Sequence, residues 1–236
     1  MRSRILLTAI ALSSSVVLGG PSSSAAQSSG GRMIPVGMEL SKVLVGSWAD
    51  YQVTQENGTV MKSRWALVAR DKDTNTIEMI SEGGPAAAAG GKIVTQLVLE
   101  SDPTSSPDPI KSVLVKAGPN PPVKVPTSMP NIQSQKFKKP DPKAMVGREE
   151  IGLGAKKLKV ERYRETSPNG NVVDIWISKE VPPFGVVRLE TRPPVQKGES
   201  APAPLKMKME LVSYGKDAKP SITDPSKAVD IPPLAK

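Results

Sequence analysis

Short runs of alternating apolar and polar residues, each bounded by turn residues, constrain the fold of this chain more than any other feature. In one such run Met61, Trp65 and Leu67 fall on one face of an extended chain. Lys62 and Arg64 fall on the opposite face. Because side chains alternate across a β-strand with a period of two, this pattern predicts strands with one face wetter than the other.

The same pattern recurs along the chain and is interrupted by residues typical of tight turns. Asn57-Gly58 and Asn169-Gly170 each lie between two such runs, which is the strongest short-range signal of a β-hairpin. Consecutive hairpins imply an antiparallel meander, and a long sheet normally curls or closes to hide its edges. We predict strands at 48–53, 59–70, 76–81, 92–100, 110–116, 149–152, 156–164, 172–179, 184–192 and 206–212.

The predicted fold is therefore mainly β, a curled antiparallel sheet of the half-barrel or open-barrel type, with long Pro-rich loops and little helix. The chain contains 24 Pro and 19 Gly, which favours many turns. Seven of the prolines fall within residues 118–142, so no central strand is expected there. We predict one β domain over residues 37–216, interrupted by a Pro/Lys-rich loop at 118–143. A flexible leader at 27–36 and a loose polar tail at 217–236 flank it.

The first 26 residues have the organisation of a secretory signal peptide. Arg2 and Arg4 precede an apolar run from Ile5 to Leu18, and Ser24-Ala25-Ala26 forms a small-residue cleavage site. The apolar run is shorter than the roughly 20 residues that span a bilayer. The sequence therefore predicts export to the periplasm or the extracellular space, with no transmembrane span in the mature chain. Nucleic acid is a poor candidate partner in that location.

The absence of Cys and His excludes many kinds of site. Without Cys the chain has no disulfide and no thiol nucleophile, and without His it lacks the commonest general base and metal ligand. The acidic run from Asp71 has calcium-loop spacing, but its sixth position is Thr76 rather than the Gly of such loops. We therefore expect no enzyme activity, no catalytic residue, no bound metal and no cofactor.

Positive charge is concentrated in the middle of the chain. The formal net charge is +9, and residues 111–164 alone carry 13 Lys and Arg against four Asp and Glu. This segment could contact an anionic headgroup, an acidic polymer or an acidic partner. The alternative interpretation is an ordinary solvated surface, since basic faces are common without a dedicated ligand.

Several passages resemble a group of uncharacterised exported bacterial proteins. They include Gly46-Ser47-Trp48-Ala49-Asp50-Tyr51, Arg64-Trp65-Ala66-Leu67-Val68, Gly147-Arg148-Glu149-Glu150, and Trp176-Ile177-Ser178 leading through Pro183-Phe184-Gly185 to Val187-Arg188-Leu189-Glu190. A sheet built in this order is similar to the half-barrels of the periplasmic lipoprotein-carrier superfamily. That resemblance implies a concave apolar face that accepts acyl chains beneath helices. No convincing long amphipathic helix is present in this sequence to form such a lid.

Two functional hypotheses follow. In the first, the exported protein binds an apolar or amphiphilic ligand of the cell envelope, such as a lipid or an acylated peptide. The apolar face would be formed by Trp65, Leu67, Ile175, Ile177, Met207 and Met209, and an anionic headgroup would be met by Lys136, Lys138, Lys139 and Lys143. In the second, a non-catalytic envelope protein with a filled core docks to an anionic envelope component through its basic surface. A large apolar cavity would favour the first hypothesis, and a packed interior the second.

Overall fold

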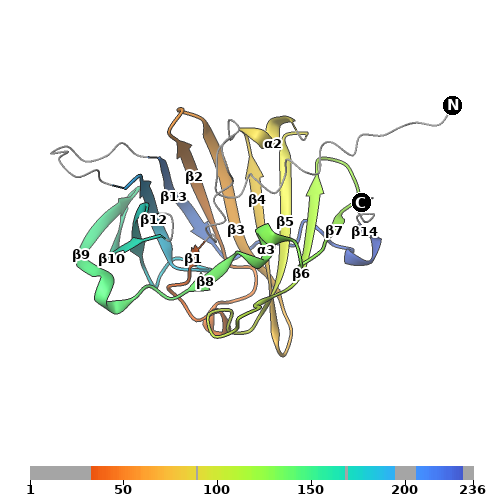
Figure 1. The fold of residues 1–236 in the computed structure, drawn as a ribbon, viewed down its shortest axis with the longest axis horizontal. Coiled ribbons are helices and arrows are strands. Elements are labelled where there is room, and N and C mark those ends of the chain that lie inside the picture. Colours follow the sequence, from red (N-terminus) through yellow and green to blue (C-terminus); the bar gives the residue numbers. More distant parts are fainter. Residues whose placement is uncertain (1–32, 89, 168–169, 195–205, 231–236) are drawn as a thin grey trace.

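A computed structural model describes residues 33–88, 90–167, 170–194 and 206–230 of the chain, and Figure 1 shows one curved sheet that dominates it. Its elements are β1 (Met33–Pro35), η2 (Leu40–Lys42), β2 (Trp48–Gln55), β3 (Val60–Arg70), β4 (Thr74–Glu82), α2 (Pro85–Ala88), β5 (Lys92–Glu100), β6 (Ile110–Ala117), β7 (Val123–Val125), α3 (Pro130–Gln133), β8 (Lys136–Lys138), η3 (Pro142–Ala144), β9 (Met145–Leu153), β10 (Lys156–Thr166), β11 (Val172–Ile177), β12 (Val186–Arg192), β13 (Met207–Gly215), η4 (Pro225–Lys227) and β14 (Val229–Asp230).

Twelve strands form the sheet in the order β14-β7-β6-β5-β4-β3-β2-β13-β12-β11-β10-β9. All neighbouring strands are antiparallel except β14 and β7, and the sheet does not close on itself within the described residues. Each half is a local meander, and the pairing of β2 with β13 joins the two halves. The predicted mainly β fold with a curled, open antiparallel sheet and little helix is confirmed.

The concave face carries the main hydrophobic core. The cross-strand registers align Ile175, Leu189, Met209, Val53 and Met61 in one row over five neighbouring strands. All five side chains are buried. This row shows how the period-two pattern directs one set of side chains to a common side of the sheet.

A small second layer lies across this concave face. It contains the parallel pair of β1 and β8, which cross in front of the sheet beside α3 in Figure 1. Ile34 and Phe137 from this pair are buried in the same core, and the ring of Phe137 lies 6.1 Å from that of Phe184. Because Ile34 and Val36 fill the core, the expected flexible leader over residues 27–36 is wrong for residues 33–36. Residues 27–32 lie outside the described part of the chain.

The convex face is covered over β4, β5 and β6 by residues after β13. Ile222 packs there against Val94 and Leu114. The carboxylate of Glu78, with the whole residue only 1 % exposed, accepts hydrogen bonds from the backbone N–H groups of Ser221 and Ile222. The expected loose tail from Asp217 is therefore corrected for residues 217–230, because this apolar patch and buried carboxylate hold the chain against the sheet. Residues 231–236 lie outside the described part.

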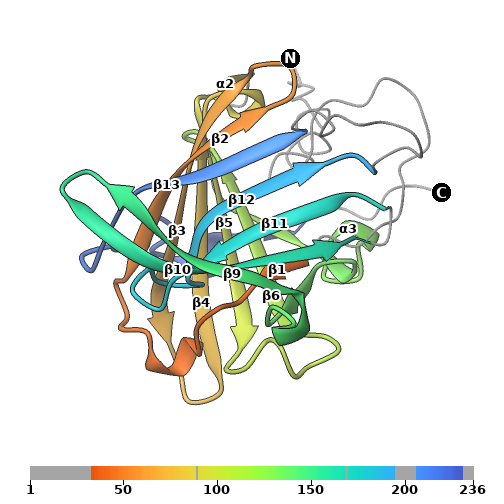
Figure 2. The same cartoon turned by 90° about the vertical axis from the view of Figure 1, so that its left-hand side faces the viewer.

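The hairpin of β9 and β10 forms the opposite end of the sheet. Figure 2 shows this hairpin standing in front of the remaining strands. Residues 145–150 of β9 are all exposed, and among the described residues β9 pairs with β10 alone. The two ends of the sheet thus differ in how far they are covered, and a cleft lies beside the exposed end.

Candidate functional site

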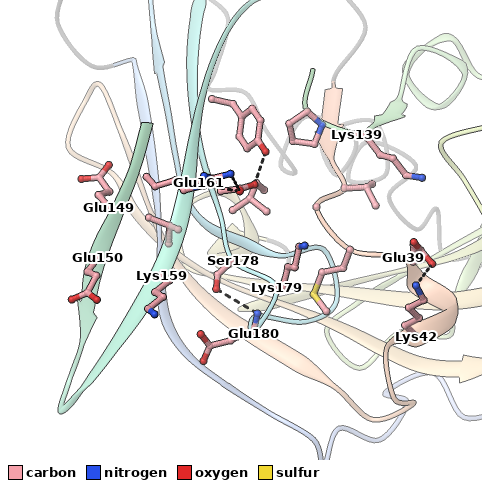
Figure 3. Close-up of a pocket in the computed structure, with 18 residues that line it drawn as sticks. Glu39, Lys42, Lys139, Glu149, Glu150, Lys159, Glu161, Ser178, Lys179 and Glu180 are labelled. Carbon is pink, nitrogen blue, oxygen red and sulfur yellow. Dashed lines mark hydrogen bonds and ion pairs between the residues drawn. The ribbon is translucent and has the colours of Figure 1, made fainter. Parts of the chain in front are cut away.

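The candidate site is a cleft of about 1040 Å³ between the β9–β10–β11 end of the sheet and the segment that follows β1. Figure 3 shows its lining, which comes from four separate parts of the chain. These are residues 36–39 with Lys42, residues 139–140, parts of β9 and β10, and residues 177–180. The volume is at the upper end of the range for small-molecule pockets.

The segment after β1 is held close to the sheet by a glycine contact. The backbone N–H of Gly37 donates to the carbonyl oxygen of Phe184 at 2.7 Å. A Cβ atom on Gly37 would stand 2.2 Å from Cγ2 of Ile177, so only glycine permits this approach. The contact places Val36 and Met38 opposite Ile177 and gives the cleft an apolar floor.

Several charged groups around this floor are already paired. Glu39 and Lys42 form an ion pair at 2.8 Å, and Arg148 pairs with Glu161 at 3.0 Å. The hydroxyl of Tyr163 donates to Glu161 at 2.7 Å, as the dashed lines of Figure 3 indicate. These carboxylates are satisfied by neighbours within the chain.

The pairing shifts the protonation equilibria of these groups. The hydrogen bond from Lys42 lowers the pKa of Glu39. The Tyr163 hydroxyl, followed by Arg148, lowers the pKa of Glu161, and burial together with the Glu161 hydrogen bond raises the pKa of Tyr163 to about 12. Both carboxylates are therefore ionised and Tyr163 is neutral at neutral pH.

Three lysines at the rim are in a different situation. Lys139, Lys159 and Lys179 are exposed, line the cleft, and form no ion pair within the described residues. Glu180 is likewise exposed and makes no ion pair in that part of the chain. The rim thus presents three amino groups outside any ion pair, together with two such carboxylates, Glu180 and Glu149, of which Glu149 accepts a hydrogen bond from the Trp176 indole.

Five of the six residues predicted to form an apolar binding face are not among those that line this cleft. Trp65, Leu67, Ile175 and Met209 are buried in the main core, and Met207 packs against it while partly exposed. The Trp65 ring lies 5.0 Å from Tyr51 and 5.7 Å from Phe184, so aromatic neighbours occupy its surroundings. Ile177 is the one member of the six that also lines the cleft.

The four predicted headgroup lysines are spread over different surroundings. Lys136 donates to the carbonyl oxygen of Pro107 at 3.3 Å, and Lys138 pairs with Glu165 at 3.2 Å. Lys143 is exposed within η3, away from the cleft lining, whereas Lys139 lies at the rim. The sequence prediction therefore placed one lysine and one apolar residue of the cleft.

Sequence reasoning missed most of the lining residues. Lys159 and Glu161 fall within the strand predicted at 156–164, but nothing local in the sequence indicates that they line a cleft with Met38. The available signal was the apolar Ile34-Pro35-Val36 segment before Gly37, which predicts burial of the leader rather than flexibility.

Within the described ranges, no group of three or more acidic residues is arranged to hold a metal ion.

In the described residues, none of the helices has the length and apolar character needed to cross a membrane. Residues 1–26 lie outside that part of the chain, so the signal peptide stays a prediction from the sequence.

Solved structures that are similar to this chain include two of low sequence identity. The hypothetical protein CT021 from Chlamydia trachomatis is 11 % identical, with a TM-score of 0.47 over 75 % of this chain and 90 % of its own. A "putative lipoprotein" from Parabacteroides distasonis ATCC 8503 is 13 % identical, with a TM-score of 0.34 over 72 % of this chain and 95 % of its own. No protein-family model and no curated protein matches the sequence. At these TM-scores the likenesses support no functional argument, and the resemblance to lipoprotein carriers stays a prediction.

Proposed function

We propose that this protein is a non-catalytic binding protein of the cell envelope that holds an anionic amphiphile in the cleft. The observation that carries the proposal is the combination of an apolar floor with three unpaired lysines at the rim. A ligand with a hydrocarbon part and an acidic head matches both components. The predicted signal peptide supports the envelope location.

The apolar floor supplies most of the expected affinity. Each methylene group removed from water contributes about 0.8 kcal/mol. Half-buried Met38 offers most of the apolar surface against which it would be buried, since Val36 and Ile177 are only 2 % and 6 % exposed.

The lysines select the acidic head. Exposed ion pairs contribute only about 0.2 to 1 kcal/mol each, so three lysines together orient the ligand and raise its affinity moderately. Glu180 and Glu149 oppose this attraction in part, because both carboxylates line the same cleft without forming an ion pair in the described part of the chain. The preference for an anion over a neutral amphiphile is accordingly expected to be about tenfold, which corresponds to roughly 1.4 kcal/mol.

Dodecanoate is a suitable probe, used below its critical micelle concentration in isothermal titration calorimetry. The K139Q/K159Q/K179Q variant is expected to bind dodecanoate about tenfold more weakly than the unmodified chain. Its binding of a neutral twelve-carbon alcohol should be unchanged. The matched control replaces exposed lysines outside the cleft, K72Q/K124Q/K219Q, and carries the same loss of charge.

A second variant tests the floor. Met38→Asn places an amide on a half-buried position and is expected to weaken both dodecanoate and the neutral alcohol. Absence of dodecanoate binding by the unmodified chain, or equal weakening by the cleft and control lysine variants, would overturn the proposal. Circular dichroism establishes that each variant is folded.

A further inference from the structure

The two edges of the twelve-stranded sheet are protected to very different degrees. One edge ends in β14, a two-residue strand that pairs with the three-residue β7. The other edge is β9, which has nine residues, contains no Pro, and pairs only with β10 among the described residues. In Figure 1 it is the outermost strand at the left. Long unpaired edges are templates for a further strand, and proteins usually shorten or cover them.

The turn between β9 and β10 fixes which backbone groups of β9 point outward. Leu153 pairs with Lys156 across a two-residue turn in which Gly154 has φ of +57°. In such a hairpin the flanking pair exchanges both hydrogen bonds, and every second residue does the same. The N–H and C=O groups of Leu153, Ile151 and Glu149 therefore point to β10. Those of Arg148 and Glu150 point away from it.

The ladder is regular from Gly147 to Leu153. The register between β9 and β10 shifts only between Arg162 and Tyr163, where Val146 is passed over on β9. A bulge of this kind ends a straight pairing edge. The stretch available to a second strand thus runs from Gly147 to Leu153 and includes Glu149.

Side-chain charges on this stretch are complementary to themselves in one antiparallel register. When Glu149 lies opposite its own copy, Arg148 faces Glu150 of the second copy, and the relation is repeated by symmetry. Gly147 then faces Ile151 of the second copy. Arg148 and Glu150 are also the residues whose backbone groups point outward, so the two cross-strand pairs make four backbone hydrogen bonds.

The neighbouring registers that satisfy the same backbone geometry are unfavourable. Centring the pairing on Arg148 opposes two arginines, and centring it on Glu150 opposes two glutamates. Like charges directly opposite each other destabilise a pair of strands. The backbone geometry and the charges therefore favour the same register.

We propose that β9 is a homodimerisation edge, at which two copies of this chain pair antiparallel about Glu149 and continue their sheets into one. The exposed Val146 and Met145, with exposed fractions of 54 % and 40 %, lie at the ends of this interface. Because Arg148 and Glu150 also line the cleft, the two clefts of the dimer lie on either side of the shared edge. The interface does not depend on the ligand proposed above.

Single cysteines test the register directly, since the chain contains no Cys of its own. Residues opposite each other in a non-hydrogen-bonded pair have Cα atoms about 4.5 Å apart, within the range of a disulfide. Glu149→Cys is therefore expected to form a covalent dimer under mild oxidation. Gly147→Cys is the matched control, because in this register its copies lie about 14 Å apart along the strands.

The control position accepts a side chain, since a Cβ atom on Gly147 meets nothing within 4 Å. Glu149→Ser controls for loss of the hydrogen bond that the Trp176 indole N–H donates to Glu149. Equal cross-linking of the two cysteine variants, or none from Glu149→Cys, would overturn the proposal.

Exchanging the charges of Arg148 and Glu150 tests whether these two side chains pair across the proposed interface. Sedimentation equilibrium should show a dimer for the unmodified chain, and at least tenfold weaker association for R148E and for E150R. The double variant R148E/E150R restores opposite charges across the interface and should recover the dimer. A folded double variant that stays monomeric, or an unmodified chain that is monomeric at about 100 µM, would contradict the proposed edge pairing. Thermal unfolding monitored in parallel identifies any variant that loses stability through its Glu161 contact.

Discussion

Two regions of the sheet, strands β3 to β6 and the hairpin of β9 and β10, are built from the same alternating pattern but have opposite surroundings. Strands β3 to β6 are covered on the concave face by the main core and over β4 to β6 on the convex face by the segment around Ile222. The hairpin of β9 and β10 has exposed residues on the first strand and a cleft beside the second. Alternation thus determines which side chains share a face. What covers that face decides whether it becomes core or binding surface.

The largest effect is expected from truncating an aromatic side chain in the covered region. Trp65→Ala should lower the free energy of unfolding by about 3 to 5 kcal/mol, because Trp65 is 2 % exposed and packs against Tyr51 and Phe184. Urea denaturation followed by circular dichroism measures it. Met145→Ala at the open edge should change stability by less than about 0.5 kcal/mol. Comparable losses for the two variants would remove the distinction between the regions.

A smaller effect is expected when the covering segment is released. Glu78→Ala leaves the backbone N–H groups of Ser221 and Ile222 without their acceptor, and should cost about 2 to 4 kcal/mol. Amide hydrogen exchange at these two residues should accelerate. Glu180→Ala, which removes an exposed carboxylate, serves as the control. Unchanged exchange at Ser221 and Ile222 would show that other contacts hold the segment.

The smallest effect concerns a hydrogen bond in the open region. Tyr163→Phe should reduce stability by about 0.5 kcal/mol at pH 7, since Glu161 is partly solvated and its bonds are screened. The pKa of Glu161 is lowered in the folded state, so its stabilising contribution is complete above the unfolded value near 4.5. It is lost as the pH falls through the lower folded value. Urea denaturation at pH 7 and pH 3 should therefore show a difference that shrinks on acidification, and a constant difference would contradict this origin.

The long strands were predictable because their signal is local. The run containing Trp65 and Leu67 indicates its inward face from alternation alone, and Asn57-Gly58 indicates the turn before it. Strands β1, β7, β8 and β14 escaped prediction, since two or three residues cannot display a period and the parallel pairs join distant segments. β1 and β8 are about 100 residues apart in the sequence.

The site was less predictable than the fold for a related reason. Trp65 and Ile177 have the same apolar signature in sequence, yet the first packs among the aromatic rings of the core and the second also borders the cleft. Lys159 and Lys179 carry no local pattern that separates a rim lysine from any other exposed lysine. Lys159 and Lys179 become rim residues because Gly37 docks on Ile177 and brings the segment after β1 beside them. That contact joins residues 140 positions apart in the chain.

The pairing of β2 with β13 determines the order in which this sheet can be completed. Strands β2 to β6 can pair as soon as each hairpin has been synthesised, because every partner follows directly in sequence. The free side of β2, however, finds its partner only when residues 207–215 have emerged. Since closing such a long loop carries a large entropic cost before any contact rewards it, joining the two halves is the late step of folding. During synthesis the growing chain therefore carries an unpaired interior strand that needs protection from association.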